Sequence, residues 1–139
     1  MSRFSGSPAG PLRHPAVLAF GAWNAAIWLL RIRNIVLADE LSLGARLLWM
    51  VPALVFGLGG LVCLVAWWSG GSVPIRLLVA VASATILYWP VRTLLILLGG
   101  HTVGFVVVHL VLAAVSVALA FAAGRQVRRS KLTPPAAYR

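Results

Sequence analysis

The chain has 139 residues, of which 61% are hydrophobic and only 10% charged, against roughly half and about a quarter in ordinary soluble domains. This composition argues against a water-soluble fold and favours an integral membrane protein. The formal net charge is +10, but the cations flank apolar runs where they act as a topology signal, so we expect no nucleic-acid partner.

The first apolar segment predicts a helix over residues 15–38. Residues 1–14 are rich in Gly, Ser and Pro, so we expect a flexible cytoplasmic N-terminal tail. Arg31 and Arg33 can extend their side chains to the interface, and the segment is then long enough to cross a hydrocarbon core of about 30 Å. A re-entrant or interfacial helix stays open. A signal peptide is disfavoured, because both arginines precede the cleavage-like residues 36–38.

Three further apolar runs predict helices over residues 46–68, 76–98 and 102–124. The connections at 69–74 and 99–101 are short and contain Gly or Pro, so we expect the second and third helices, and the third and fourth, to form antiparallel hairpins. The predicted fold class is an all-α integral membrane protein, a four-transmembrane-helix bundle. Its membrane domain covers residues 15–124, and a basic cytoplasmic tail covers 125–139.

The distribution of cations predicts that both termini face the cytoplasm. With four crossings, eight cations lie on the side of the termini and three on the opposite side, as the positive-inside tendency requires. A three-crossing arrangement gives five inside against six outside and is disfavoured. The arginine-rich composition suggests a bacterium, and hence its cytoplasmic (inner) membrane. The cations expected to fix this orientation or to attract anionic phospholipids are Arg125, Arg128, Arg129 and Lys131.

Arg92 is the most unusual residue of the predicted helices. An arginine near the bilayer centre costs about 2.5 to 3.5 kcal/mol on insertion scales. The second, third and fourth apolar runs contain no acid, and Asp39 and Glu40 stand together in the first connection. We therefore expect Arg92 to meet one of these acids, a lipid phosphate or an acid of another protein. The alternative is an arginine that only snorkels to the interface.

Two other polar residues are candidate contacts with a partner or a lipid. His109 lies as far after the turn between Gly100 and His101 as Arg92 lies before it, so the two are expected at one depth, facing each other. A neutral histidine can accept a hydrogen bond from the guanidinium but cannot neutralise it. Asn24 stands among small residues, where an interhelical hydrogen bond contributes about 0.6 to 2 kcal/mol.

Some helix contacts and one kink can also be expected. Small residues four positions apart allow close helix packing, and the last helix is the best candidate for a tight contact, either within the bundle or with a partner. Pro90 is expected to kink the third helix near Ile86. The small residues concerned include Ala53 with Gly57, and Ser116, Ala120 and Gly124.

No residue pattern indicates a reaction. The sequence has no phosphate-binding loop, no dinucleotide fingerprint, no HExxH and no paired carboxylates. Its histidines are scattered and Cys63 is its single cysteine, so we expect no enzymatic activity, catalytic residue, cofactor or metal.

The function hypothesis is a small accessory or assembly subunit of a larger bacterial membrane complex. Examples are a lipid-transport, envelope-biosynthesis or respiratory assembly. Its expected partners are larger integral membrane subunits and anionic phospholipids. The alternative is a self-assembling small transporter, pore or holin-like protein, in which Asn24, Arg92 and His109 lie along the path.

Overall fold

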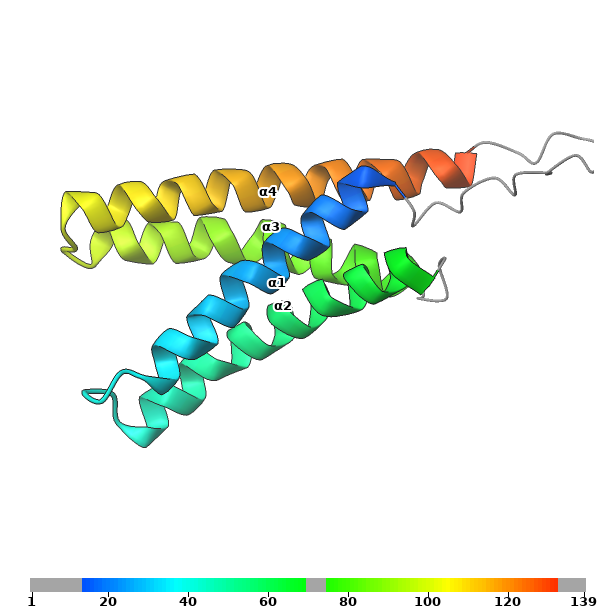
Figure 1. Cartoon of the computed structure of the whole chain (residues 1–139). Helices are drawn as coiled ribbons and strands as arrows, with labels where there is room; N and C mark the ends of the chain where they lie inside the picture. Colours follow the sequence, from blue (N-terminus) through cyan, green and yellow to red (C-terminus); the bar gives the residue numbers. More distant parts are fainter. Residues whose placement is uncertain (1–13, 70–74, 133–139) are drawn as a thin grey trace, which may run out of the picture.

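Four helices form the computed structural model, which describes residues 14–69 and 75–132 (Figure 1). Each helix is long and apolar enough to cross a membrane. The predicted all-α fold with four helices of spanning length is therefore confirmed for these residues. The helices are α1 Pro15–Val36, α2 Leu43–Ser69, α3 Ile75–Leu98 and α4 Val103–Leu132.

The first helix is continuous over its 22 residues, about 33 Å at 1.5 Å per residue. Its start is defined by His14, whose Nδ1 accepts a hydrogen bond from the Ala16 amide at 3.1 Å, and by Pro15 at the first helical position. α2 begins three residues before the predicted boundary at 46. Ser42 caps it, since its Oγ accepts from the Ala45 amide at 3.3 Å.

The last helix extends beyond its expected end at residue 124 to Leu132. Gly124 does not end it, and the following residues favour or tolerate a helix until Pro134, the next residue in the sequence that opposes one. The first part of the predicted tail over 125–139 is therefore helical. Residues 133–139, like residues 1–13, lie outside the described part of the chain.

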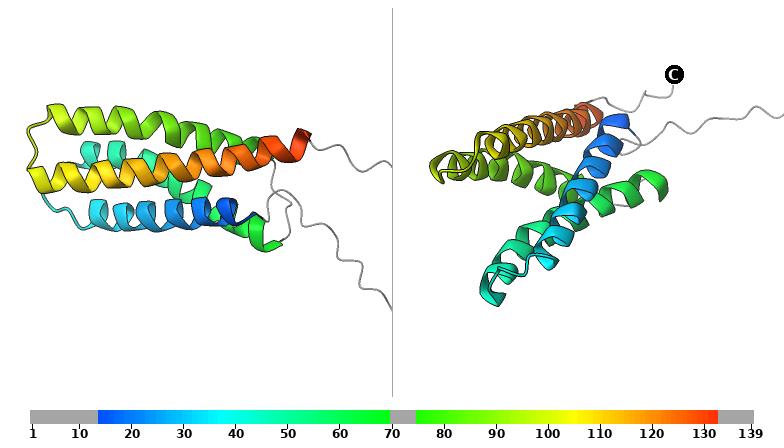
Figure 2. Two further views of the ribbon diagram at one scale, coloured as in Figure 1. Left: turned by 90° about the horizontal axis from the view of Figure 1, so that it is seen from above. Right: turned by 60° about the vertical axis from the view of Figure 1, so that its left-hand side comes forward.

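The helices pair as α1 with α2 and α3 with α4, and the two pairs cross (Figures 1 and 2). The pairs lie close together where α1 begins and α4 ends, which we call the terminal end. They diverge toward the α1–α2 and α3–α4 connections, which we call the loop end. The predicted hairpin of α3 with α4 is seen. The predicted hairpin of α2 with α3 is wrong as a packing unit, because α2 packs mainly on α1 and contacts α3 little.

The α1–α2 pairing has a physical cause in two glycines. A Cβ on Gly60 would lie 2.5 Å from the Ala25 amide nitrogen and 2.9 Å from the Gly21 carbonyl oxygen. A Cβ on Gly21 would lie 2.9 Å from the Cys63 Cβ. The two backbones are therefore in direct contact, an approach that only small residues permit. In the last helix, Ser116 and Ala120 are buried, whereas a Cβ on Gly124 would meet no atom within 4 Å. A tight contact of this helix with a partner stays a prediction.

Two buried clusters and one polar contact join the hairpins. The terminal-end cluster includes Phe20 and Leu78, and the second cluster, nearer the loop end, includes Trp28, Phe56 and Trp89. Between them, the indole N–H of Trp23 donates to the hydroxyl of Ser116 at 2.9 Å, which links α1 to α4. The two hairpins are thus joined by buried side chains and by one hydrogen bond.

Proline does not interrupt the third helix. α3 runs through Pro90 as one helix, and the expected kink near Ile86 stays a prediction.

Candidate functional site

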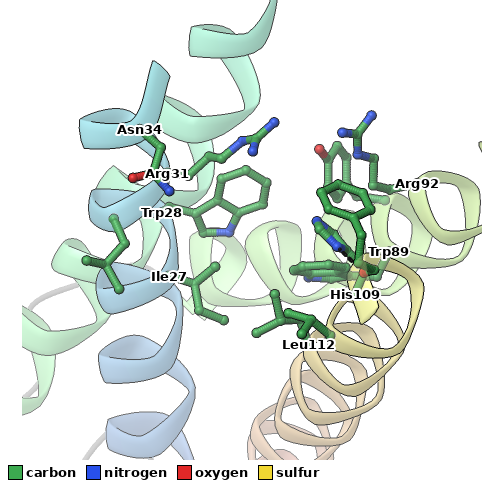
Figure 3. A pocket seen from close by; sticks show the side chains of 12 residues that line it. Ile27, Trp28, Arg31, Asn34, Trp89, Arg92, His109 and Leu112 are labelled. Carbon is green, nitrogen blue, oxygen red and sulfur yellow. Dashed lines mark hydrogen bonds between the residues drawn. The ribbon is translucent and has the colours of Figure 1, made fainter. Parts of the chain in front are cut away.

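A cavity of about 330 Å³ lies between the hairpins, and we call it the cleft (Figure 3). Its lining comes from α1, α3 and α4, and eight of the twelve lining residues are apolar or aromatic. No acidic residue lines it. The four polar or charged lining residues are Arg31, Asn34, Arg92 and His109.

The charged part of the cleft lies at one level of the bundle. Arg31 is five residues from the end of α1, and Arg92 is six residues from the end of α3. Trp49 and His109 each stand six residues after the start of their own helices, α2 and α4. At 1.5 Å per residue these positions lie about 8 to 9 Å along each helix from the loop end. Four helices therefore bring these side chains to a similar depth.

Arg31 and Arg92 share one aromatic ring. The guanidinium carbon of Arg92 lies 4.3 Å from the centroid of the Trp49 indole, and that of Arg31 lies 5.7 Å from it. Together these distances limit the separation of the two guanidinium carbons to 10.0 Å. Cation–π contacts of this kind contribute about 0.5 to 2 kcal/mol each, more when they are desolvated.

The Trp49 ring contacts both arginines, but it carries no net charge and does not neutralise theirs. At 10 Å and an effective dielectric constant of about 20, two like charges repel by roughly 1.7 kcal/mol. An anion between them would be attracted by both guanidinium groups, and charge-assisted hydrogen bonds to it are the strong kind. The cleft is therefore chemically suited to a negatively charged group.

The acids of the chain do not supply that group. Asp39 pairs with Arg46 at 3.8 Å, and its carboxylate is fully exposed. Arg46 Nη2 also donates to the Ala38 carbonyl at 2.6 Å, which closes the α1–α2 connection. Within the described residues, no ion pair joins Arg92 to Asp39 or Glu40, so the expected snorkelling contact with these acids is not seen.

His109 and Arg92 come together in the lining of the cleft, as the equal spacing from the turn predicted. His109 Nδ1 lies 2.8 Å from the Phe105 carbonyl oxygen, and a carbonyl oxygen only accepts, so Nδ1 donates. In a neutral imidazole this places the proton on Nδ1 and makes Nε2 an acceptor. His109 can thus receive a hydrogen bond from a ligand or from an arginine.

Asn24 lies apart from the cleft. Its side chain is buried, and its amide nitrogen donates to the Phe20 carbonyl at 3.0 Å within α1. A Cβ on Gly60 would lie 3.0 Å from the Asn24 Cβ, so this residue belongs to the α1–α2 contact. Of the three predicted contact residues, the structure brings Arg92 and His109 together and leaves Asn24 out.

Arg31 and Asn34 are site residues that were not expected from the sequence. Ile27, Arg31 and Asn34 follow a spacing of four and then three residues, which places them on one face of a helix. That stripe is visible in the sequence. The contribution of Trp49 is not, because it depends on how α2 lies against α1 and α3.

An aromatic group forms a rigid wall of the cleft. Trp28 stacks on Phe56 with ring centroids 5.0 Å apart, and Tyr88 lies 5.4 Å from Trp28 and 6.0 Å from Trp89. Such pairs contribute about 0.5 to 1.5 kcal/mol each beyond the area they bury. Because the rings come from α1, α2 and α3, they fix the position of Arg92 relative to Arg31.

The predicted basic cations lie at the other end of the bundle. Arg125 and Arg128 line a second cavity of about 320 Å³ between α3 and α4, together with Ser83. Arg129 follows on the same helix, and the side chain of Lys131 lies outside the described part of the structure.

Among the residues that the structure describes, no three His, Cys, Asp or Glu side chains lie close enough together to hold a metal ion. No protein-family model, no curated protein and no solved structure matches the chain.

Proposed function

We propose that the protein is a small accessory subunit of a larger bacterial membrane complex, and that the cleft is the part of it that receives an anionic group. One observation carries this proposal: Arg31 and Arg92 lie over the same Trp49 ring in a cleft that no acid lines. A buried or half-buried cation without a countercharge is costly, and a bound anion removes that cost.

The proposal includes an orientation. Both termini face the cytoplasm, so the loop end and the cleft face outward, because eight cations lie on the side of the termini. The anion then reaches the cleft from the outer half of the bilayer. The protein belongs to the bacterial cytoplasmic membrane on this account.

A self-assembling transporter, pore or holin-like protein has less support. It needs polar side chains along one path, and Asn24 lies in the α1–α2 contact rather than beside Arg92 and His109.

Mild detergent extraction followed by mass spectrometry tests the accessory role. The wild-type chain is expected to co-purify with larger integral subunits at a fixed ratio. Arg92→Leu is expected to weaken this association by about 1.5 to 3 kcal/mol, at least about tenfold. The substitution removes a charge-assisted contact with the anionic group at the subunit contact, whether that group is an acid of the subunit or the phosphate of a lipid that lies against it. Arg92→Lys is expected to restore only part of the association, since lysine lacks the planar fork.

The matched control is Arg33→Leu, which removes the same charge from an exposed position on α1 that does not line the cleft. A homogeneous homo-oligomer without larger subunits would contradict the accessory role. Equal losses for Arg92→Leu and Arg33→Leu would contradict the role of the cleft.

A further inference from the structure

We infer that the occupant of the cleft is an anionic phospholipid whose phosphate is bound between Arg31 and Arg92. The inference rests on the proposed anion-receiving role and names the source of the anion as a lipid rather than an acid of a partner protein. Three features of the cleft favour a lipid: its gradient of polarity, its size and its hydrogen-bonding groups.

The polarity of the cleft changes along its length. Figure 3 shows Arg31, Asn34 and Arg92 at one end and Ile27 and Leu112 at the other. The charged end lies nearer the loop end, where a headgroup lies if the helices cross the bilayer. The cleft is therefore amphipathic in the same direction as a phospholipid of that leaflet.

The size of the cleft suits a small ligand. The cavity holds about 330 Å³, within the usual range of small-ligand sites. A phospholipid headgroup and the first part of an acyl chain are ligands of this class.

The hydrogen-bonding groups match a phosphate diester with a polyol headgroup. Each guanidinium can donate two parallel hydrogen bonds to phosphate oxygens, and the guanidinium carbons of Arg31 and Arg92 lie 5.7 and 4.3 Å from the centroid of the same Trp49 ring. His109, with its proton on Nδ1, offers Nε2 as an acceptor for a headgroup hydroxyl. The chemical class is therefore an anionic glycerophospholipid such as phosphatidylglycerol.

Tryptophan quenching by brominated lipid tests this inference on the full chain reconstituted in vesicles. Trp28 and Trp89 line the cleft, and Trp49 contacts the guanidinium of Arg92. Trp67 and Trp68 lie near the terminal end of α2. Replacing Trp67 and Trp68 by Phe in every sample lowers the background. The vesicles are phosphatidylcholine with a minority of either brominated phosphatidylglycerol or brominated phosphatidylcholine, and the readout is the difference in quenching between the two.

The wild-type protein is expected to be quenched more by brominated phosphatidylglycerol. Arg31→Gln and Arg92→Gln are each expected to reduce that enrichment roughly fivefold, the effect of one cation near a lipid phosphate. Arg33→Gln removes the same charge two residues away from Arg31, outside the cleft, and is expected to leave the enrichment unchanged. Circular dichroism checks that each variant keeps its helices.

Three results would overturn the inference. Equal quenching of the wild-type protein by the two lipids would show no selective site. An equal loss in Arg33→Gln would show a general charge effect. Loss of the enrichment in millimolar inorganic phosphate would assign the site to a soluble anion. If the lipid inference fails while Arg92→Leu still releases larger subunits, the anion belongs to a partner protein and the proposed function stands.

Discussion

Single residues decide where the backbones of this bundle meet. Gly60 has no room for a Cβ, because the Ala25 amide nitrogen lies 2.5 Å from that position, whereas Gly124 has open space on α4. In the sequence both are glycines in apolar runs, and nothing local distinguishes the tightly packed glycine from the open one. Their difference depends on the distance between helices, which no local pattern encodes.

Gly60→Ala is expected to destabilise the protein by about 1 to 3 kcal/mol, the range for overpacking, because the added methyl group meets backbone atoms that cannot yield. Gly124→Ala is the matched control and is expected to stabilise the protein by up to about 1 kcal/mol, because alanine has a higher helix propensity than glycine. Thermal unfolding in detergent measures both. Equal effects of the two substitutions would contradict the α1–α2 backbone contact.

The two arginines of the cleft differ in how far the sequence reveals them. Arg92 stands out in the sequence because it interrupts an apolar run, and the structure places it in the cleft. Arg31 does not stand out, because an arginine near the end of a span is explained by snorkelling alone. The link between the two arginines is their common contact with Trp49, and this contact depends on the packing of α2.

At the scale of helices, the number of elements follows from apolar length, but their pairing does not. The short connection predicts that α2 pairs with α3. In the structure α2 pairs with α1, because the glycines of these two helices allow their backbones to meet. Gly124 and the following cations resemble the end of a span, so the predicted end of α4 at residue 124 comes too early. Helix propensity carries α4 on to Leu132.

The hydrogen bond between Trp23 and Ser116 is expected to couple α1 to α4 by about 0.6 kcal/mol, the average for such bonds in membranes. A double-mutant cycle with Trp23→Phe and Ser116→Ala measures this coupling in the free energy of unfolding. Thr85→Ala with Trp23→Phe is the control pair, because the Thr85 hydroxyl donates to Val81 within α3. Additive effects of Trp23→Phe and Ser116→Ala would contradict the contact.

For the whole molecule, the crossing of the two hairpins explains why the cleft between them lies toward the loop end. The two hairpins converge at the terminal end and diverge toward the loop end (Figure 2). Side chains of both hairpins pack together in the terminal-end cluster, and the cleft lies between the hairpins nearer the loop end. The cation count in the sequence bears on which end faces the cytoplasm, and it does not predict the divergence.

Both termini are expected to face the cytoplasm, and the connection over residues 39–44 is expected to face the outside of the cell. Single cysteines at Ser42 and Ser130 in a Cys63→Ala background can be labelled with a membrane-impermeant thiol reagent on intact cells. Ser42→Cys is expected to react and Ser130→Cys to react only after lysis, because the positive side stays inside. The reverse labelling pattern would place the cleft on the cytoplasmic side.

The most direct test of the central claim identifies what occupies the cleft in the native membrane. Leu30 lines the cleft at 61% exposure, and its neighbour Leu29, at 48% exposure, does not line it. A photoreactive amino acid at position 30 is expected to form adducts enriched in anionic phospholipid relative to position 29. That enrichment is expected to disappear when Arg31→Gln and Arg92→Gln are combined. Identical adducts at the two positions, unchanged by removing both arginines, would contradict the claim that the cleft receives an anionic group.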